Sequence, residues 1–334
     1  MEDQPESGGV VVARREPAEW ERFASSFASI ADNIQHVIQG KEHEVKLALV
    51  CLVAEGHLLI EDVPGVGKTM LAKSMARSID CSFRRIQFTP DLLPTDVTGV
   101  NVYNQERGDF EFKPGAIFAN VVLGDEINRA SPKTQSALLE SMEEHQVTMD
   151  GVTYHLGIPF MVIATQNPIE HEGTYPLPEA QLDRFMMRLS IGYPRAEAEK
   201  SILSTHGVAS TLEDIEPVTD ARGISEMVMM ARDVHVANAL LGYIVGLSEA
   251  TRDHPDVYLG ASPRASIMLL RASRALAAAE GRDYVVPDDV KSLTIPVMAH
   301  RILLSADAAM AGKTSGSLLT DVLSSVPVPV RDRA

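Results

Sequence analysis

One segment constrains the fold of this chain more than any other: EDVPGVGKT at residues 61–69. It follows the apolar run HLLI and precedes a stretch with helical periodicity. Gly65 and Gly67 let the backbone approach a ligand without side-chain bulk, and the helix that follows directs its first N–H groups to the same point. The segment therefore predicts a strand, a phosphate-binding loop and a helix in succession. The alternative is an ordinary strand–turn–helix corner.

The last residues of this segment carry the chemistry. Lys68 can reach the outer phosphates of a nucleotide, and Thr69 can offer its hydroxyl to Mg²⁺. The strict GxxxxGK[ST] pattern fails only at its first position, which is Asp62. A second GKT at 312–314 has neither a preceding strand nor the second glycine, so we interpret it as part of the tail. The nucleotide-binding residues predicted here are Val63, Pro64, Gly65, Val66, Gly67, Lys68, Thr69 and Met70.

The rest of the first two hundred residues repeats the alternation of strand and helix. Four further apolar segments have strand character, namely FRRIQFT, NVVLGDEI, PFMVIATQN and RLSIGY. NVVLGDEI is apolar almost throughout, as expected for a strand that is buried on both faces. Helical periodicity covers residues 18–39, up to Gly40, and then 41–55. This alternation predicts an α/β fold, a doubly wound parallel sheet with an αβα core.

Two insertions and one boundary organise the chain. Residues 100–116 and 146–157 alternate around turn signals and predict β-hairpins, the second around an Asp-Gly pair. The strand signal disappears after Pro194. We therefore predict a mobile N-terminal arm at 1–17, an α/β core at 18–194, and a smaller helical domain at 195–334 with a Pro-rich C-terminal tail.

An acidic pair near the end of NVVLGDEI is predicted to act together with the phosphate loop. Asp125 is predicted to hold Mg²⁺ through water, and Glu126 to orient and polarise the water that attacks the terminal phosphate. Taken alone, the pair could be a strand end with solvated acids. An adjacent acidic pair after an apolar strand, in a chain with a phosphate loop, favours the catalytic interpretation.

Three more polar residues are candidates. Asn167 ends the strand FMVIATQN and could bind both the attacking water and the phosphate, although Asn before Pro is common in turns. Arg184, in QLDRF, is placed on a helix just before the last strand, where a solvated or salt-bridged arginine is the alternative. Arg264 follows Ser-Pro at a helix start. Because a cation is disfavoured at a helix N-terminus, it suggests an anionic partner.

Composition excludes several other classes of protein. Lys plus Arg is 30 and Asp plus Glu is 46, so the net charge is −16, which argues against nucleic acid or an anionic membrane as a general partner. Cys51 and Cys81 form no CxxC pair, so no disulfide framework or zinc site is expected, and the cytoplasm is the predicted location. No apolar run approaches the ~18 residues of a membrane span. EHE at 170–172 is interpreted as a polar loop.

The ordered set of motifs is more selective than any one of them. EDVPGVGKT, LPTDVTG, GAIFANVVLGDEINRASPKTQSALLESMEE, ATQNP, GTYPLPEAQLDRF and GASPRA occur in this order, and a SVPVP ending follows. Together they resemble the MoxR family of AAA+ ATPases over roughly residues 20–330.

The resemblance implies ATP and Mg²⁺ as cofactors, an ATPase core with a helical lid, and a homo-oligomeric ring, a hexamer. It implies that Asn167 is the sensor 1 residue, that Arg184 is an arginine finger acting on the neighbouring subunit, and that Arg264 is the sensor 2 arginine. It also places Ile38 and Gly40 at the adenine. Members of this family work with von Willebrand factor A domain proteins on client protein complexes. The resemblance therefore implies such partners for this chain.

Two functions of different classes follow. The first is an ATPase that hydrolyses ATP with Mg²⁺ and remodels or matures client protein complexes. The second is a nucleotide-gated scaffold whose hydrolysis is incidental; the presence of Glu126 and Arg184 favours the first. A metal-chelatase-like motor subunit is a further alternative, although no chelation residues are visible. An ATPase acting on nucleic acid is disfavoured by the acidic charge.

Overall fold

The computed structural model describes residues 15–168, 173–206 and 212–329. Most of the predicted N-terminal arm, the EHE segment and the end of the Pro-rich tail lie outside the described residues. Within them, no helix is long and apolar enough to cross a membrane.

A five-stranded sheet forms the centre of the molecule, with the order β2-β5-β8-β1-β9. Every neighbouring pair in it is parallel. The strands are β1 (Leu58–Glu61), β2 (Phe83–Gln87), β5 (Val121–Asp125), β8 (Met161–Gln166) and β9 (Met187–Leu189). These are the five segments with strand character in the sequence, so the predicted doubly wound α/β fold is confirmed.

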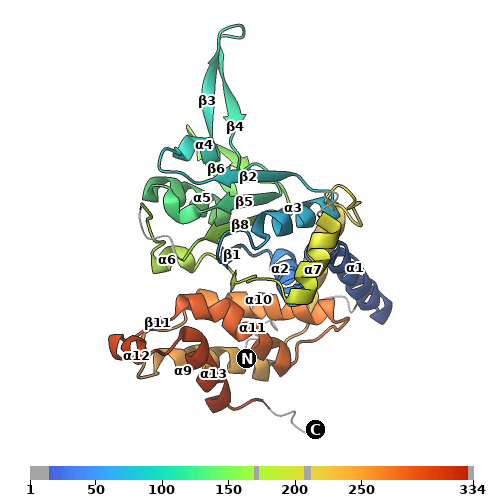
Figure 1. Ribbon diagram of the computed structural model, residues 1–334, viewed down its shortest axis with the longest axis vertical. Helices are drawn as coiled ribbons and strands as arrows, with labels where there is room; N and C mark the ends of the chain where they lie inside the picture. Colours follow the sequence, from blue (N-terminus) through green and yellow to red (C-terminus); the bar gives the residue numbers. More distant parts are fainter. Residues whose placement is uncertain (1–14, 169–172, 207–211, 330–334) are drawn as a thin grey trace, which may run out of the picture.

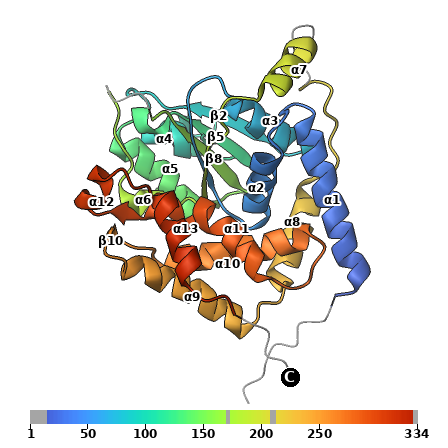
Figure 2. The same cartoon turned by 60° about the horizontal axis from the view of Figure 1, so that its bottom comes forward.

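Helices cover both faces of this sheet (Figure 2). Leu58 and Ile60 belong to one hydrophobic cluster and Leu59 to the other, because successive side chains of a strand point to opposite faces. The first cluster packs against α1 (Pro17–Gln35), α2 (Glu42–Val53) and α3 (Lys68–Ser78). The second packs against α4 (Pro94–Thr98) and α5 (Pro132–Glu144). Double-sided burial explains why the central strands are apolar almost throughout.

The two hairpins lie next to each other. The first pairs β3 (Gly99–Asn104) with β4 (Asp109–Pro114) and projects from the body of the molecule (Figure 1). The second pairs β6 (Gln146–Met149) with β7 (Val152–His155) around Asp150 and Gly151, which both have positive φ, 51° and 80°. Phe112 and Tyr154 stack with ring centroids 3.9 Å apart, which joins the hairpins.

The region after residue 194 is mainly helical. Its helices are α7 (Ala196–His206), α8 (Ala221–Asp233), α9 (Asn238–Arg252), α10 (Pro263–Ala279), α11 (Pro287–Met298), α12 (Ala306–Met310) and α13 (Ser315–Ser325). A short antiparallel sheet of β10 (Val257–Leu259) and β11 (Leu303–Leu304) was not predicted. Part of the presumed tail is also folded, because Thr314 caps α13, whose Leu318, Leu319 and Val322 are buried.

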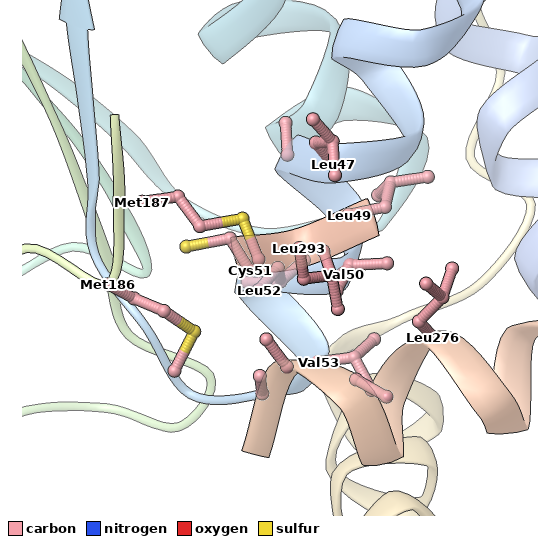
Figure 3. Close-up of a cluster of buried hydrophobic side chains, with 14 of the residues drawn as sticks. Leu47, Leu49, Val50, Cys51, Leu52, Val53, Met186, Met187, Leu276 and Leu293 are labelled. Carbon is pink, nitrogen blue, oxygen red and sulfur yellow. The ribbon is translucent and has the colours of Figure 1, made fainter. Parts of the chain in front are cut away.

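The helical region shares a hydrophobic core with the sheet domain. Figure 3 shows side chains of α2 between Met186 and Met187 at β9 and Leu276 and Leu293 of α10 and α11. Cys51 lies in this cluster and is fully buried, which raises the pKa of its thiol and leaves it a small apolar side chain. One hydrophobic core runs through both parts and therefore marks no boundary between them. The division near residue 195 stays a prediction.

Candidate functional site

The phosphate loop connects β1 to α3. Gly65 and Gly67 have φ of 85° and 97°, which side chains rarely tolerate, and Gly67 is the N-cap of α3. A Cβ at Gly65 would meet no atom within 4 Å, so the loop leaves open space in front of it. No acidic residue occupies the first turn of α3. The loop therefore presents backbone N–H groups and a helix N-terminus toward an anion.

Asp62 explains the one departure from the strict loop pattern. Its carboxylate accepts hydrogen bonds from the N–H of Val63 (2.8 Å), the hydroxyl of Ser190 (3.1 Å) and the N–H of Gly192 (2.5 Å). Burial alone would raise the pKa of Asp62, but these hydrogen bonds outweigh it and lower the pKa below its ordinary value. Asp62 thus ties the loop to the segment that follows β9.

Lys68 is oriented toward the loop. Its Nζ donates a 2.6 Å hydrogen bond to the backbone oxygen of Asp62. Burial lowers its pKa, and the charges of Asp62, Asp125 and Glu126 act in the opposite direction. Lys68 therefore lies within electrostatic reach of both members of the acidic pair.

Asp125 is held at the end of β5 by two neighbouring strands. Arg85 of β2 forms a 2.6 Å ion pair with its Oδ2. The hydroxyl of Thr165, from β8, donates to Oδ1 at 2.7 Å and accepts from the N–H of Glu126 at 2.9 Å. The two acids are therefore fixed by one threonine, and neither Arg85 nor Thr165 was singled out from the sequence.

Glu126 has a left-handed backbone, with φ 57° and ψ 51°. This conformation is uncommon for a residue with a side chain, and such strain is often found at active sites. Its Oε2 accepts from Nε2 of Gln87 at 2.9 Å and pairs with Nε of Arg129 at 3.2 Å. Arg129 thus contacts the predicted base of its own chain.

Asn167 completes the arrangement. It is buried and directly follows β8, the strand between β5 and β1. Gln166 is in register with Glu61, so Asn167 emerges beside the start of the phosphate loop. The structure therefore brings the loop, the acidic pair and Asn167 together at the carboxyl edge of three adjacent strands.

The same edge fits Mg²⁺. Thr69, in the first turn of α3, and Asp125 carry side-chain oxygens, the type of ligand that Mg²⁺ prefers. No group of three or more His, Cys, Asp or Glu residues suited to a metal occurs in the described part of the chain. An ion here would need phosphate oxygens and water as further ligands, which is the usual way that Mg²⁺ binds with a nucleotide.

Ile38 and Gly40 lie on the loop between α1 and α2. A Cβ on Gly67 would stand 3.8 Å from Cδ1 of Ile38, so Ile38 borders the phosphate loop. Gly40 has φ of 70°, and a Cβ there would stand 2.9 Å from Cβ of Ala198 in α7. This part of α7 was not singled out from the sequence. The base-binding position of Ile38 and Gly40 stays a prediction.

Arg184 and Arg264 lie elsewhere. Arg184 occupies a turn after the short helix α6 (Glu179–Leu182), not a helix as predicted, because the fully buried Phe185 leads the chain into β9. Its Nε pairs with Oε2 of Glu143 at 3.0 Å. Arg264 pairs with Oε1 of the same carboxylate. The anionic partner expected for Arg264 is thus a glutamate of this chain.

These arginines are at the amino edge of the sheet. Arg184 precedes β9, and Glu143 lies in the last turn of α5. The backbone oxygen of Met142, the residue before Glu143, accepts a 3.0 Å hydrogen bond from His57. His57 directly precedes β1. The phosphate loop follows β1 at its other end. Four strand residues separate the two ends by ~13 Å at ~3.3 Å per residue. The structure therefore does not bring either arginine to the phosphate loop of its own chain.

Comparison with known proteins gives a consistent picture. Residues 57–187 match the ATPase family associated with various cellular activities (AAA), and residues 249–322 match the AAA lid domain. The chain is 48% identical to the uncharacterized protein YeaC of Bacillus subtilis, over 91% of this chain and 95% of that protein. It is 42% identical to Chaperone MoxR1 of Mycobacterium tuberculosis, over 89% of this chain and 80% of that protein.

A solved structure agrees with these matches. The crystal structure of a candidate ATPase from Cytophaga hutchinsonii superimposes with a TM-score of 0.88 at 37% identity, over 94% of this chain and 98% of that one. Sequence identity, domain content and three-dimensional fold therefore support the same family assignment. This chain belongs to the MoxR family of AAA+ ATPases.

Proposed function

We propose that this chain hydrolyses ATP with Mg²⁺ in a ring, a hexamer, whose ATP sites are each completed by the neighbouring subunit. The observation that carries this proposal is the separation of the charges. The phosphate loop and the acidic pair lie at one edge of the sheet, and the arginine pair lies at the other. One subunit cannot bring both the phosphate loop and its arginine pair to the same phosphate. In this proposal, two neighbouring subunits therefore form each ATP site.

Within one subunit, the carboxyl edge binds ATP and prepares the water. The N–H groups around Gly65 and Gly67 and the ammonium of Lys68 bind the phosphates. Thr69 and Asp125 would hold Mg²⁺, which supplies positive charge to the phosphate oxygens. Glu126 accepts the proton of the attacking water at its carboxylate, and Gln87 keeps that carboxylate oriented. Asn167 positions the water by hydrogen bonding.

The neighbouring subunit supplies the remaining positive charge. An arginine stabilises the charge on the transferred phosphate in the transition state. Arg184 does this in trans, and Arg264 joins it, because the same glutamate binds both. A head-to-tail contact in which one edge meets the opposite edge of the next copy closes into a ring when the rotation permits. The predicted hexamer is such a ring.

Hydrolysis is then coupled to work on a client protein complex in the cytoplasm. The support is the family and the name of the mycobacterial relative, a chaperone. The predicted partner is a protein with a von Willebrand factor A domain. To identify it, Glu126→Gln subunits can be loaded with ATP and used as bait. Recovery of such a protein with ATP, but not with ADP, supports the assignment; its absence from both samples contradicts it.

The biochemical core of the proposal is tested with purified full-length protein. We expect phosphate release from ATP that stops when EDTA removes Mg²⁺ and returns when Mg²⁺ is added. Light scattering is expected to show a shift to a hexamer when ATP is added. A monomer at micromolar concentration in every nucleotide state would contradict the shared sites.

A further inference from the structure

Glu143 connects two arginines that come from different parts of the chain. Arg184 belongs to the turn before β9, and Arg264 to the first turn of α10. Each binds a different oxygen of the Glu143 carboxylate. Resting on the proposed function, we propose that Glu143 is a positioning residue, which holds Arg184 and Arg264 as one pair directed at a phosphate of the neighbouring subunit.

The need for such a residue follows from charge. Two guanidinium groups at one place repel each other, and Arg264 is also disfavoured by the helix dipole at the start of α10. A carboxylate between them offsets both costs. Without it, the two long side chains are free to move apart. A second phosphate contact would then have to be ordered at the moment of reaction, which costs entropy.

The pair is also accessible to a ligand. The exposed fractions are 28% for the Arg184 side chain and 35% for that of Arg264. A guanidinium has five N–H donors in a planar fork, so each arginine keeps donors that Glu143 does not use. Glu143 therefore fixes the direction of the two arginines without saturating them.

A second carboxylate links the two segments that carry Arg184 and Arg264. Asp183, next to Arg184, accepts from the hydroxyl of Ser262 at 3.1 Å, and Ser262 is the N-cap of the helix that carries Arg264. Nε of the buried Arg301 lies 3.2 Å from the same carboxylate. Since Asp183 already links the two segments, the role left for Glu143 is to orient the arginine side chains.

These five side chains, Asp183, Glu143, Arg184, Arg264 and Arg301, form what we call the arginine cluster. Burial lowers the pKa of Arg301 to about 10, so it stays protonated at neutral pH. Three cations against two carboxylates leave one net positive charge. In a chain of net charge −16, this local excess suits an anion brought by another subunit.

The first test is Glu143→Gln in the full-length protein. We expect ATP binding at wild-type strength and a turnover about tenfold lower, equivalent to about 1.4 kcal/mol in the barrier. Glu144→Gln, the exposed neighbour on the same helix, is the matched control and should match wild type. In a protein that already carries Arg184→Ala and Arg264→Ala, Glu143→Gln should cause no further loss.

The second test asks where Glu143 acts. When Glu143→Gln subunits are mixed with Lys68→Ala subunits, activity should rise above that of either variant alone. The restored sites combine a sound phosphate loop from the first with a sound arginine pair from the second. A residue that only supports its own subunit would show no such rescue. If Glu143→Gln unfolds at a lower temperature than wild type, Glu143→Ala, which keeps good helix propensity, replaces it.

The outcomes separate this inference from the function on which it rests. If Arg184→Ala abolishes turnover and Glu143→Gln equals wild type, the positioning role is overturned and the shared site stands. A further loss caused by Glu143→Gln in the protein without both arginines also overturns it. If Arg184→Ala itself keeps full turnover, the proposed function fails first.

Discussion

The two edges of the central sheet are built in different ways. At the carboxyl edge, the loop, Lys68 and Thr69 come from nine consecutive residues, and the acidic pair and Asn167 follow adjacent strands. At the amino edge, the arginine cluster is assembled from four separate segments, including α5, the turn before β9 and the helical lid.

The difference has a functional reason. Phosphate binding needs convergent N–H groups, which a single loop and helix provide. The arginine cluster instead combines residues of the core, Glu143, Asp183 and Arg184, with residues of the lid, Arg264 and Arg301. In the function proposed above, the carboxyl edge binds nucleotide alone, and the amino edge acts on a neighbouring subunit.

The largest expected effect separates the edges completely. Lys68→Ala removes the cation at the phosphates and should abolish ATP binding, which is measured by titration with labelled nucleotide. Lys313→Ala is the matched control. Lys313 belongs to the second GKT and pairs instead with Asp256 on the lid, so binding should be unchanged. Wild-type affinity in Lys68→Ala would refute the assignment of the loop.

The next effect separates binding from chemistry within the carboxyl edge. Glu126→Gln keeps the shape of the side chain and removes the base. Nucleotide should bind normally, and turnover measured by phosphate release should fall by ~10²–10⁴. If turnover persists, the base lies elsewhere in the site, and Glu126 with its unusual backbone has a structural role only.

The same contrast governs what the sequence could predict. The loop and the acidic pair are local, so the sequence alone could predict them. Gln87 and Arg85 had a weak signal, as polar residues on one side of a strand beside β5. Glu143 had none, because Glu140 and Glu144 on the same helix are equally plausible, and its partners lie 41 and 121 residues away.

The errors in secondary structure have a similar origin. The helix predicted around Arg184 ends early because Phe185 enters the core. The segment SGSLLTDVLSS looks like a polar tail, yet Leu318, Leu319 and Val322 have helical spacing and a partner surface that only the folded lid provides. In both cases tertiary packing overrides the local pattern.

The smallest effect is the loss of unfolding free energy as pH falls. Groups at the amino edge should cause this loss at a higher pH than groups at the carboxyl edge. His57 is fully buried, accepts from the N–H of Val162 at Nδ1 and donates from Nε2 to Met142, and burial lowers its pKa to about 4 from 6.5. A lowered histidine pKa gives stability above pH 6.5 that is lost as pH falls toward 4. From His57 alone we expect about 2 kcal/mol less unfolding free energy at pH 5 than at pH 7.5.

Denaturant unfolding at the two pH values checks this. Asp62 has a lowered pKa, so its contribution at the carboxyl edge is lost only below its ordinary value of 3.8. His57→Gln should flatten the pH dependence between 6.5 and 5, leaving the part due to the buried His300, whose pKa burial also lowers. An unchanged slope in His57→Gln would show that His57 does not titrate as described.

The central claim, that one ATP site uses the two opposite edges of neighbouring subunits, is tested most directly by mixing two inactive variants. Arg184→Ala should bind ATP and lose ~10³–10⁵ in turnover. In an equal mixture with Lys68→Ala, about one interface in four pairs a sound loop with a sound arginine. The account predicts that activity appears on mixing, approaching that fraction of wild type. A mixture no more active than the separate variants would contradict it.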